Sequence, residues 1–240
     1  MSQEKLPPNI EIPGPLRYKI AKWNQGSKIE DNIELTVEGL NHVMRTGATH
    51  AVANHRNRKW DVPVLGYALS DIRTPYYPAK KRYGKGLFGI KRWIMQGSGA
   101  LFFDEESEEE HLKVLRQMFK HAELGHMLVT LPEGTSRNRG ENLGKLEAGA
   151  LEIAIRTGAD EVILMGLGGT ETSSGRDEDK EITPTRVHLE IGAVSLAEAK
   201  DEYASTSKRD RKDLVVDLTE RLIRPSLQEV VSIAYEQAAA

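Results

Sequence analysis

The chain has 240 residues, of which 39% are hydrophobic and 29% charged, and this is enough apolar sequence for one substantial core. It contains no cysteine, so disulfides, thiolate metal sites and cysteine nucleophiles are excluded. The N-terminus lacks a signal-peptide pattern, and no apolar run reaches the roughly 18 residues of a membrane-spanning helix. We therefore expect a cytoplasmic protein that is soluble or peripheral to a membrane.

The charges are segregated, although the net charge is only −3. Residues 80–95, KKRYGKGLFGIKRWIM, carry six basic side chains and no acid, whereas residues 104–110, DEESEEE, carry six acids. A basic apolar block in a mildly acidic chain favours an anionic ligand or surface over general binding of nucleic acid.

The N-terminal segment, residues 1–30, combines a Pro-rich stretch with a short amphipathic helix. Leu16, Ile20 and Trp23 recur at helical spacing in LRYKIAKWN, residues 16–24. Two interpretations are open: the helix docks these three side chains on the core, or it lies at a membrane interface.

The remainder, residues 31–240, is predicted to form a single domain in which short apolar strands alternate with helices. Strands are expected within residues 32–40, 49–54, 99–106, 126–134, 161–169 and 185–194. Helices are expected within residues 62–71, 107–125 and 144–159, and from about residue 208 as a long C-terminal helix interrupted at Pro225. This alternation predicts an α/β fold with a mixed, mostly parallel sheet flanked by helices.

The helix within residues 107–125 carries the clearest local signals. Ser107 and Glu110 form a capping-box pattern at its start. Its apolar stripe is predicted to comprise Leu112, Leu115 and Phe119.

Two polar segments follow predicted strands directly: Asn54-His55, and the loop 132–140 with the sequence PEGTSRNRG. Ligands gather at the carboxyl ends of strands in open α/β sheets, so we expect both segments to share one crevice. Asp61 can either cap the following helix or fold back to orient His55. In the second case, with no activated Ser or Cys nearby, the imidazole would deprotonate a substrate hydroxyl directly.

The loop 132–140 suits a phosphate, because it combines glycine backbone, free amides and two guanidinium groups. A solvated turn with incidental charges is the alternative. No metal site is expected: His50 and His55 face opposite sides of a strand, and no HExxH motif occurs. A phosphate-ester hydrolase is a weaker hypothesis, since it would need metal carboxylates or a covalent nucleophile.

Taken in order, these segments resemble the glycerolipid acyltransferase family typified by bacterial lysophosphatidate (1-acylglycerol-3-phosphate) acyltransferases. VANHRNRKWD is similar to the first motif of that family, Asn-His followed by Asp, and LPEGTSRNRG is similar to the third. Weaker similarities lie in LTVEGL, YYPAKKRYGKGLFG, GSGALFFDEES and VILMGLGGTE, which match the first strand, the lysine segment, the second motif and the fourth. The resemblance spans residues 35–170.

The resemblance implies transfer of a fatty acyl group from acyl-CoA or acyl carrier protein to the hydroxyl of a lysophospholipid such as 1-acylglycerol-3-phosphate, without a further cofactor. It implies that His55 is the general base and Asp61 its orienting partner. The substrate-binding residues that it implies are Asn54, Lys80, Lys81, Glu133, Gly134, Thr135, Arg137 and Arg139. Among them, Glu133 and Gly134 would shape the acceptor site, and the basic residues would hold its phosphate.

The sequence departs from the family pattern in three places. Five residues, rather than four, separate the histidine of the first motif from its aspartate. Ser136 stands in the third motif where the family has Arg, and Asp104-Glu105 stand in the second where the family has a basic residue. These departures leave a second hypothesis open, that of a catalytically inactive relative which binds lipid or membrane peripherally.

Access to lipid is expected through peripheral docking on the anionic inner face of the membrane by residues 16–23 and 85–95. Apolar and basic side chains are interleaved in the second of these segments. The alternative is that its apolar residues line the core or an acyl-chain tunnel.

Overall fold

The computed structural model describes residues 15–43, 49–57, 59–84, 89–134, 141–170 and 186–240. Within these residues, seven strands form one sheet in the order β1-β7-β6-β2-β5-β3-β4. Neighbours are parallel except for β6 and β7, which are antiparallel. The strands are β1 (Glu34–Glu38), β2 (Thr49–Ala53), β3 (Pro75–Lys80), β4 (Ala100–Phe103), β5 (Met127–Thr130), β6 (Glu161–Gly168) and β7 (Arg186–Ser195).

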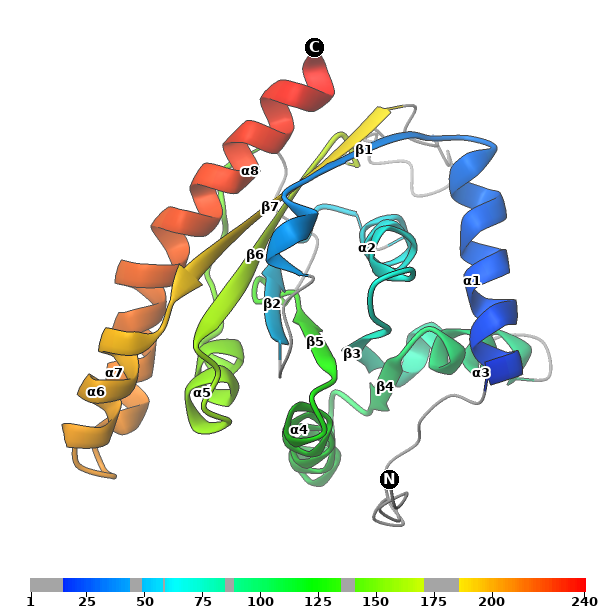
Figure 1. Ribbon diagram of the computed structural model, residues 1–240. Coiled ribbons are helices and arrows are strands. Elements are labelled where there is room, and N and C mark those ends of the chain that lie inside the picture. Colours follow the sequence, from blue (N-terminus) through cyan, green and yellow to red (C-terminus); the bar gives the residue numbers. More distant parts are fainter. Residues whose placement is uncertain (1–14, 44–48, 58, 85–88, 135–140, 171–185) are drawn as a thin grey trace, which may run out of the picture.

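Helices cover both faces of the sheet, with α1 and α2 on one side and α5 and α8 on the other (Figure 1). The α/β class and the mixed, mostly parallel sheet flanked by helices are therefore confirmed. The helices are α1 (Pro15–Glu30), α2 (Asp61–Leu69), α3 (Ile90–Gly97), α4 (Glu108–Glu123), α5 (Gly149–Arg156), α6 (Ala197–Ser205), α7 (Arg211–Leu218) and α8 (Arg224–Ala239).

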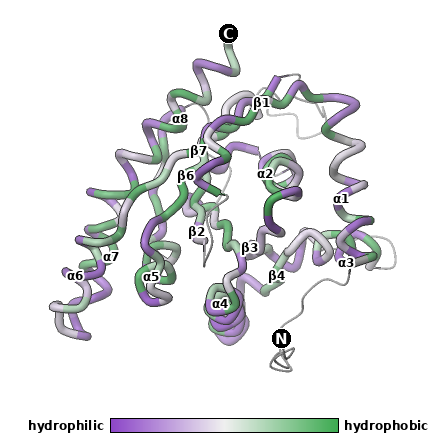
Figure 2. The backbone as a smooth tube through the Cα atoms, in the orientation of Figure 1, coloured by the Kyte–Doolittle hydropathy of each residue, from purple (hydrophilic) through white to green (hydrophobic). Residues whose placement is uncertain are grey.

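The central strands are apolar on both faces because each face is covered. In β2, Ala51 and Ala53 belong to the core beneath α1 and α2, whereas Val52 belongs to the core beneath α5 and α8. Figure 2 shows hydrophobic residues along β6 and hydrophilic residues over much of α4. Burial on both faces explains why these strands appear in the sequence as continuous apolar runs.

Strand β3, which contains two prolines, was not among the predicted strands. Pro75 is its first residue, where the sheet tolerates proline. Tyr77 donates its backbone N–H to Gly99 on the β4 side at 3.1 Å, so the position of Pro78, one residue on, faces β5. Pairing between β3 and β5 ends at Tyr76, and the missing donor of Pro78 therefore costs no ladder bond there.

The predicted apolar stripe of α4 is wrong for two of its three residues, whereas Phe119 is partly buried and packs against the core. Leu112 and Leu115 are exposed, and the buried face contains Val114, Met118 and His121 instead. The ring of His121 stacks on Tyr76 with a centroid distance of 3.9 Å, so an imidazole contributes to the packed face. The predicted helix cap is confirmed in part, because the hydroxyl of Ser107 accepts from the Glu110 N–H at 3.3 Å.

The expectation that α1 docks all three of its apolar residues on the core is also wrong. Leu16 and Trp23 are 70% and 72% exposed, while α1 packs through Ala21 and Ile29. The predicted break in the C-terminal helix is confirmed: a π-helical turn follows α7, and α8 begins with Pro225 in its first turn.

Residues 1–14, the Pro-rich part of the N-terminal segment, lie outside the described residues. Within the described part of the chain, no helix is long and apolar enough to cross a membrane.

Two glycines of β6 allow α8 to lie directly on the sheet. A Cβ atom built on Gly166 would overlap the backbone of Val230, and one on Gly168 would overlap the backbone of Ala234. Close approach of a helix backbone to a strand thus depends on the absence of these side chains.

We expect Gly168→Ala to lower the free energy of unfolding by about 1–3 kcal/mol, because the added methyl group forces α8 away from β6. Urea unfolding followed by circular dichroism measures the change. Gly149→Ala is the matched control, since a Cβ there meets no atom within 4 Å, and it should leave stability unchanged or slightly raised. Equal stabilities for the two variants would contradict this packing argument.

Candidate functional site

The carboxyl ends of β2 and β5 bring two distant segments to one point of the sheet edge. Val52 is in register with Thr130, so the residues three positions further on, His55 and Glu133, emerge level with each other. The backbone N–H of His55 donates to Glu133 Oε1 at 3.0 Å. His55 and the described start of the second segment, residues 132–134, therefore lie together at the carboxyl edge of the sheet.

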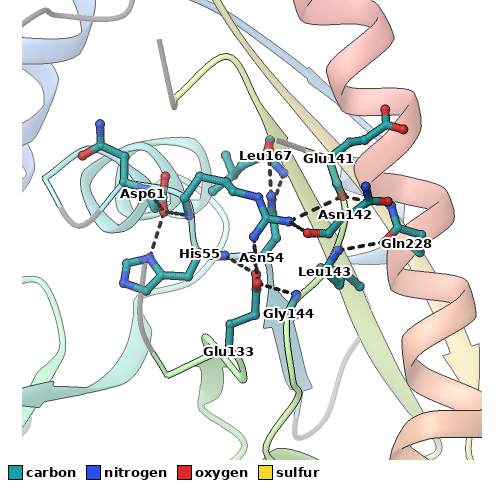
Figure 3. A network of polar contacts seen from close by, with 12 residues as sticks. Asn54, His55, Asp61, Glu133, Glu141, Asn142, Leu143, Gly144, Leu167 and Gln228 are labelled. Carbon is teal, nitrogen blue, oxygen red and sulfur yellow. Dashed lines mark hydrogen bonds and ion pairs between the residues drawn. The ribbon is translucent and has the colours of Figure 1, made fainter. Parts of the chain in front are cut away.

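His55 and Asp61 contact each other through their side chains. Nδ1 of His55 lies 2.9 Å from Oδ2 of Asp61 (Figure 3). The same oxygen accepts the backbone N–H groups of Arg56 and Asn57, each at 2.7 Å. Three donors thus converge on one carboxylate oxygen, and they hold this carboxylate next to Nδ1 of the imidazole.

Asp61 is the first residue of α2 and not its cap. The cap position is Trp60, and no side-chain capping bond is present there. The carboxylate is fully buried at the N-terminus of the helix, where the helix dipole favours a negative charge. Of the two roles that the sequence left open for Asp61, the structure has the one in which it folds back to His55.

A tight turn accommodates the additional residue between His55 and Asp61. The carbonyl of Asn57 accepts the backbone N–H groups of Trp60 and Asp61 at 3.2 and 3.0 Å. Its side-chain oxygen accepts the N–H of Lys59 at 2.9 Å. Asn is well suited to such a turn because its side chain replaces a backbone acceptor. The longer spacing therefore keeps the histidine and the aspartate in contact.

A carboxylate accepts hydrogen bonds only, so the contact with Asp61 assigns the proton of neutral His55 to Nδ1. The lone pair then belongs to Nε2, which makes no hydrogen bond with any described residue. The His55 side chain retains 12% of its surface exposed. This arrangement can accept a proton from a hydroxyl that approaches Nε2.

A buried ion pair joins the turn after β2 to the end of β5. Nη1 of Arg56 lies 2.6 and 2.8 Å from the two carboxylate oxygens of Glu133, and neither side chain has exposed surface. Glu133 Oε2 also accepts the backbone N–H of Gly144 at 2.9 Å. The carboxylate of Glu133 is thus directed into the protein, and it reaches the site through the backbone N–H of His55.

The same network continues to α8. Nη2 of Arg56 donates to the carbonyl of Asn142 at 3.1 Å. The Gln228 side chain accepts the Leu143 N–H and donates to the Glu141 carbonyl, each at 2.9 Å. Figure 3 shows these contacts reaching Gln228 on the α8 ribbon. One helix of the opposite face thereby holds the segment that supports Arg56.

Asn54 has its amide bound within the fold. It donates to the Leu167 carbonyl at 2.9 Å and accepts the Leu167 N–H at 2.7 Å. The side chain is fully buried. It extends the β2–β6 pairing by one position beyond the last backbone pair, so the structure does not present Asn54 to a substrate as expected.

The acidic residues of the second motif pair with the lysine segment. Nζ of Lys80 lies 2.7 Å from Oε2 of Glu105, and Lys81 is paired with Glu110. Nη1 of Arg82 lies 2.7 Å from the other oxygen of Glu105. The hydrogen bond from Lys80 lowers the pKa of Glu105. The acidic residue Glu105, which stands where the family has a basic residue, therefore neutralises the neighbouring cations Lys80 and Arg82.

Lys81 is not brought to His55. It lines a cavity of about 200 Å³ between α1, α3, α4 and β4, together with Arg17, Arg92 and Lys113. Neither His55 nor Asp61 is among the residues that line this cavity. Lys80 ends β3, which is the second strand from β2 along the sheet.

Gly134 is exposed and adopts a positive φ of 65°, a backbone conformation that favours glycine. The expected substrate-binding residues Thr135, Arg137 and Arg139 lie outside the described residues.

Sequence reasoning missed Arg56 and Gln228 as supporting residues. Arg56 directly follows His55, and its guanidinium binds the carboxylate of Glu133. An arginine and a glutamate at the ends of two neighbouring parallel strands could have indicated the pair. Gln228 gave no signal in the sequence.

A family model described as Acyltransferase matches residues 34–167, which is more than half of the chain. A search of curated protein sequences gave no significant match. The crystal structure of the 1-acyl-sn-glycerophosphate (LPA) acyltransferase PlsC from Thermotoga maritima has a similar fold, with a TM-score of 0.58 and 20% identity over 89% of this chain and 78% of that chain.

We expect Glu133→Gln to lower the free energy of unfolding by about 3–5 kcal/mol, because it leaves the guanidinium of Arg56 buried without a counter-charge. Urea unfolding measures the loss. Glu105→Gln is the control: it removes a partly exposed ion pair and should cost about 1 kcal/mol or less. If Glu133→Gln lowered the free energy of unfolding no more than this control does, the buried pair would not stabilise the fold as argued.

Proposed function

The chain belongs to the Acyltransferase family, and from this premise we propose that it moves a fatty acyl group from acyl-CoA or acyl carrier protein to the hydroxyl of a lysophospholipid such as 1-acylglycerol-3-phosphate. The observation that carries this proposal is the 2.9 Å contact between His55 Nδ1 and Asp61 Oδ2. The acceptor class is also the one named for the T. maritima protein of similar fold.

In the proposed reaction, Nε2 of His55 removes the proton from the acceptor hydroxyl as its oxygen attacks the thioester carbonyl. Asp61 keeps the imidazole in the required tautomer and stabilises the positive charge that forms on it. The tetrahedral intermediate then collapses with loss of the thiolate. The proton held by His55 passes to this leaving group, so the histidine returns to its neutral form.

Arg56 and Glu133 are proposed to position His55 rather than to touch substrate. Both ends of the His55-Arg56 backbone are held, since Glu133 accepts the N–H of His55 and Asp61 accepts the N–H of Arg56. Such supporting contacts hold a general base within a few tenths of an ångström of the position that proton transfer requires.

The acceptor phosphate is proposed to bind Lys80, with Arg137 or Arg139 of the third motif as further cations. Lys80 is bound by Glu105 at 2.7 Å, so a phosphate would have to share or displace this carboxylate. Lys81, which lines a separate cavity, is the weaker candidate.

We expect His55→Ala to lower the rate of acceptor-dependent acyl transfer by about 10²–10⁴-fold, the usual range for loss of a general base. Asp61→Asn should cause a large loss as well, because an amide cannot hold the imidazole proton on Nδ1 in the same way. Thiol release from long-chain acyl-CoA, or from acyl carrier protein, is measured with a panel of lysophospholipids.

His111→Ala is the matched control, since this histidine lies exposed on α4. Its activity should equal that of the native protein. Acceptor-dependent thiol release that survives in His55→Ala would remove His55 from the chemistry. No release with either donor and any acceptor would favour the inactive lipid-binding relative instead.

Peripheral docking is proposed through the packed pair of helices α1 and α3. Leu16 and Trp23 are exposed seven residues apart on α1, and Ile90 and Trp93 are exposed three apart on α3. The two helices contact each other, and Arg17 Nε donates to the Trp93 carbonyl at 2.9 Å. The exposed cations on these helices include Lys19, Lys91 and Arg92. Apolar and basic side chains together suit an anionic bilayer surface.

The double variant Trp23→Ser, Trp93→Ser should bind anionic vesicles at least about tenfold more weakly, because each buried aromatic side chain contributes about 1.5–3 kcal/mol. Sedimentation with phosphatidylglycerol-containing vesicles measures the affinity, which should also fall with added salt. Leu112→Ser, which removes an exposed apolar residue of α4, is the control and should bind as the native protein. Affinity that is indifferent to anionic lipid or to the tryptophans would exclude this surface.

A further inference from the structure

Three potential metal ligands converge on the far side of the sheet from His55. They are Glu38 at the end of β1 and His188 and Glu190 on β7. Glu38 is directly paired with Glu190, and His188 lies two residues before Glu190. One nitrogen of the imidazole and one oxygen of each carboxylate all lie within 4.8 Å of one another.

The pairing of β7 with β6 decides which face these side chains occupy. Glu190 is directly opposite Gly166, and His188 is directly opposite Gly168. Directly paired residues of antiparallel strands have their side chains on the same face of the sheet. The glycine positions of β6 face α8, so the three ligands lie on the α8 face beside β1. The imidazole of His55 projects toward α2 on the other face, where its partner Asp61 begins that helix.

The burial of the three residues is graded. His188 is buried, Glu190 is partly buried, and Glu38 is exposed at the edge strand. Two of the ligands are therefore held by the sheet, while the third has a side chain that is free to rotate. An ion can enter from the solvent side of β1 without any opening of the core.

The distances suit a small divalent ion. His188 Nε2 lies 3.1 Å from Glu190 Oε2. Two ligands each bound at about 2.0–2.2 Å in a tetrahedral site lie roughly 3.4 Å apart, so this pair is almost at the required separation. Rotation of the exposed Glu38 side chain brings in the third oxygen, and water completes the coordination.

We propose that Glu38, His188 and Glu190 form a binding site for a divalent transition-metal ion of the zinc class, separate from the His55 site. An imidazole nitrogen selects such ions over Mg²⁺ and Ca²⁺, which prefer ligand sets made of oxygen alone. Bound metal would tie the edge strand β1 to β7 and so stabilise the folded protein by mass action.

The site was not expected from the sequence, because its three ligands are not close together along the chain. Glu38 is separated from the other two ligands by about 150 residues, and only the parallel pairing of β1 with β7 brings them together. No short motif can indicate a set of this kind.

The test is calorimetric titration of the intact protein with Zn²⁺, with thermal unfolding in the presence and absence of the ion as a second reading. We expect one equivalent to bind and to raise the unfolding temperature. Glu38→Gln should weaken binding at least about tenfold, and His188→Gln should do the same. Excess Mg²⁺ or Ca²⁺ should not compete. The exposed position of Glu38 keeps its variant folded even if replacement of the buried His188 lowers stability.

Glu34→Gln is the matched control, because Glu34 lies on the same face of β1 and is paired with Arg186 at 3.6 Å. It should bind Zn²⁺ as the native protein does. His126→Gln tests whether Zn²⁺ binds elsewhere, at the pair of histidines whose Nδ1 atoms, those of His121 and His126, are 2.9 Å apart. Absence of binding, binding undiminished in Glu38→Gln, or binding lost only in His126→Gln would each overturn the proposal.

Discussion

A guanidinium and a carboxylate without exposed surface face each other where β2 and β5 end, and the geometry of the site depends on this pair. Arg56 and Glu133 are separated along the chain by α2, β3, α3, β4, α4 and β5, yet the parallel register of two neighbouring strands makes them adjacent. Neither charge can be removed alone without leaving the other unpaired in the interior. The pair therefore fixes the two strand ends relative to each other.

The position of His55 follows from this constraint. Its backbone is held by Glu133, and the backbone of the next residue is held by Asp61, which also binds the imidazole. A single carboxylate oxygen thus sets both the loop and the tautomer of the histidine. Support from α8 through Gln228 extends the constraint to the opposite face of the sheet.

The fold class and most elements could be predicted because parallel strands buried on both faces leave apolar runs in the sequence. Features that depend on contacts between segments distant in the sequence could not be predicted. The prolines of β3 are compatible with a strand only because β5 stops pairing at Tyr76, and the buried face of α4 includes His121 because Tyr76 offers a ring to stack on. Both facts belong to the tertiary structure.

The same division holds for the candidate site. The sequence pointed to His55 and Asp61 through residue types next to a strand end, but whether a turn could absorb the fifth intervening residue depended on the side chain of Asn57. Direct contacts with substrate were expected for Asn54 and Glu133. In the structure both side chains bind other parts of the protein: Asn54 binds the backbone of Leu167, and Glu133 binds the side chain of Arg56. A polar residue at a strand end can either bind substrate or hold the fold together, and only its burial in the structure distinguishes the two roles.

The most direct test of the account is nuclear magnetic resonance of the protein with ¹⁵N-labelled histidines, in which the resonances of His55 are assigned by their loss in His55→Gln. We predict that in the neutral imidazole of His55 the Nδ1 gives the shift and one-bond proton coupling of a protonated nitrogen, and Nε2 the shift of an unprotonated one. Replacement of Asp61 by Asn should abolish this preference. A proton found on Nε2 in the native protein, or a tautomer that is indifferent to Asp61, would contradict the claim that Asp61 prepares His55 to act as a base.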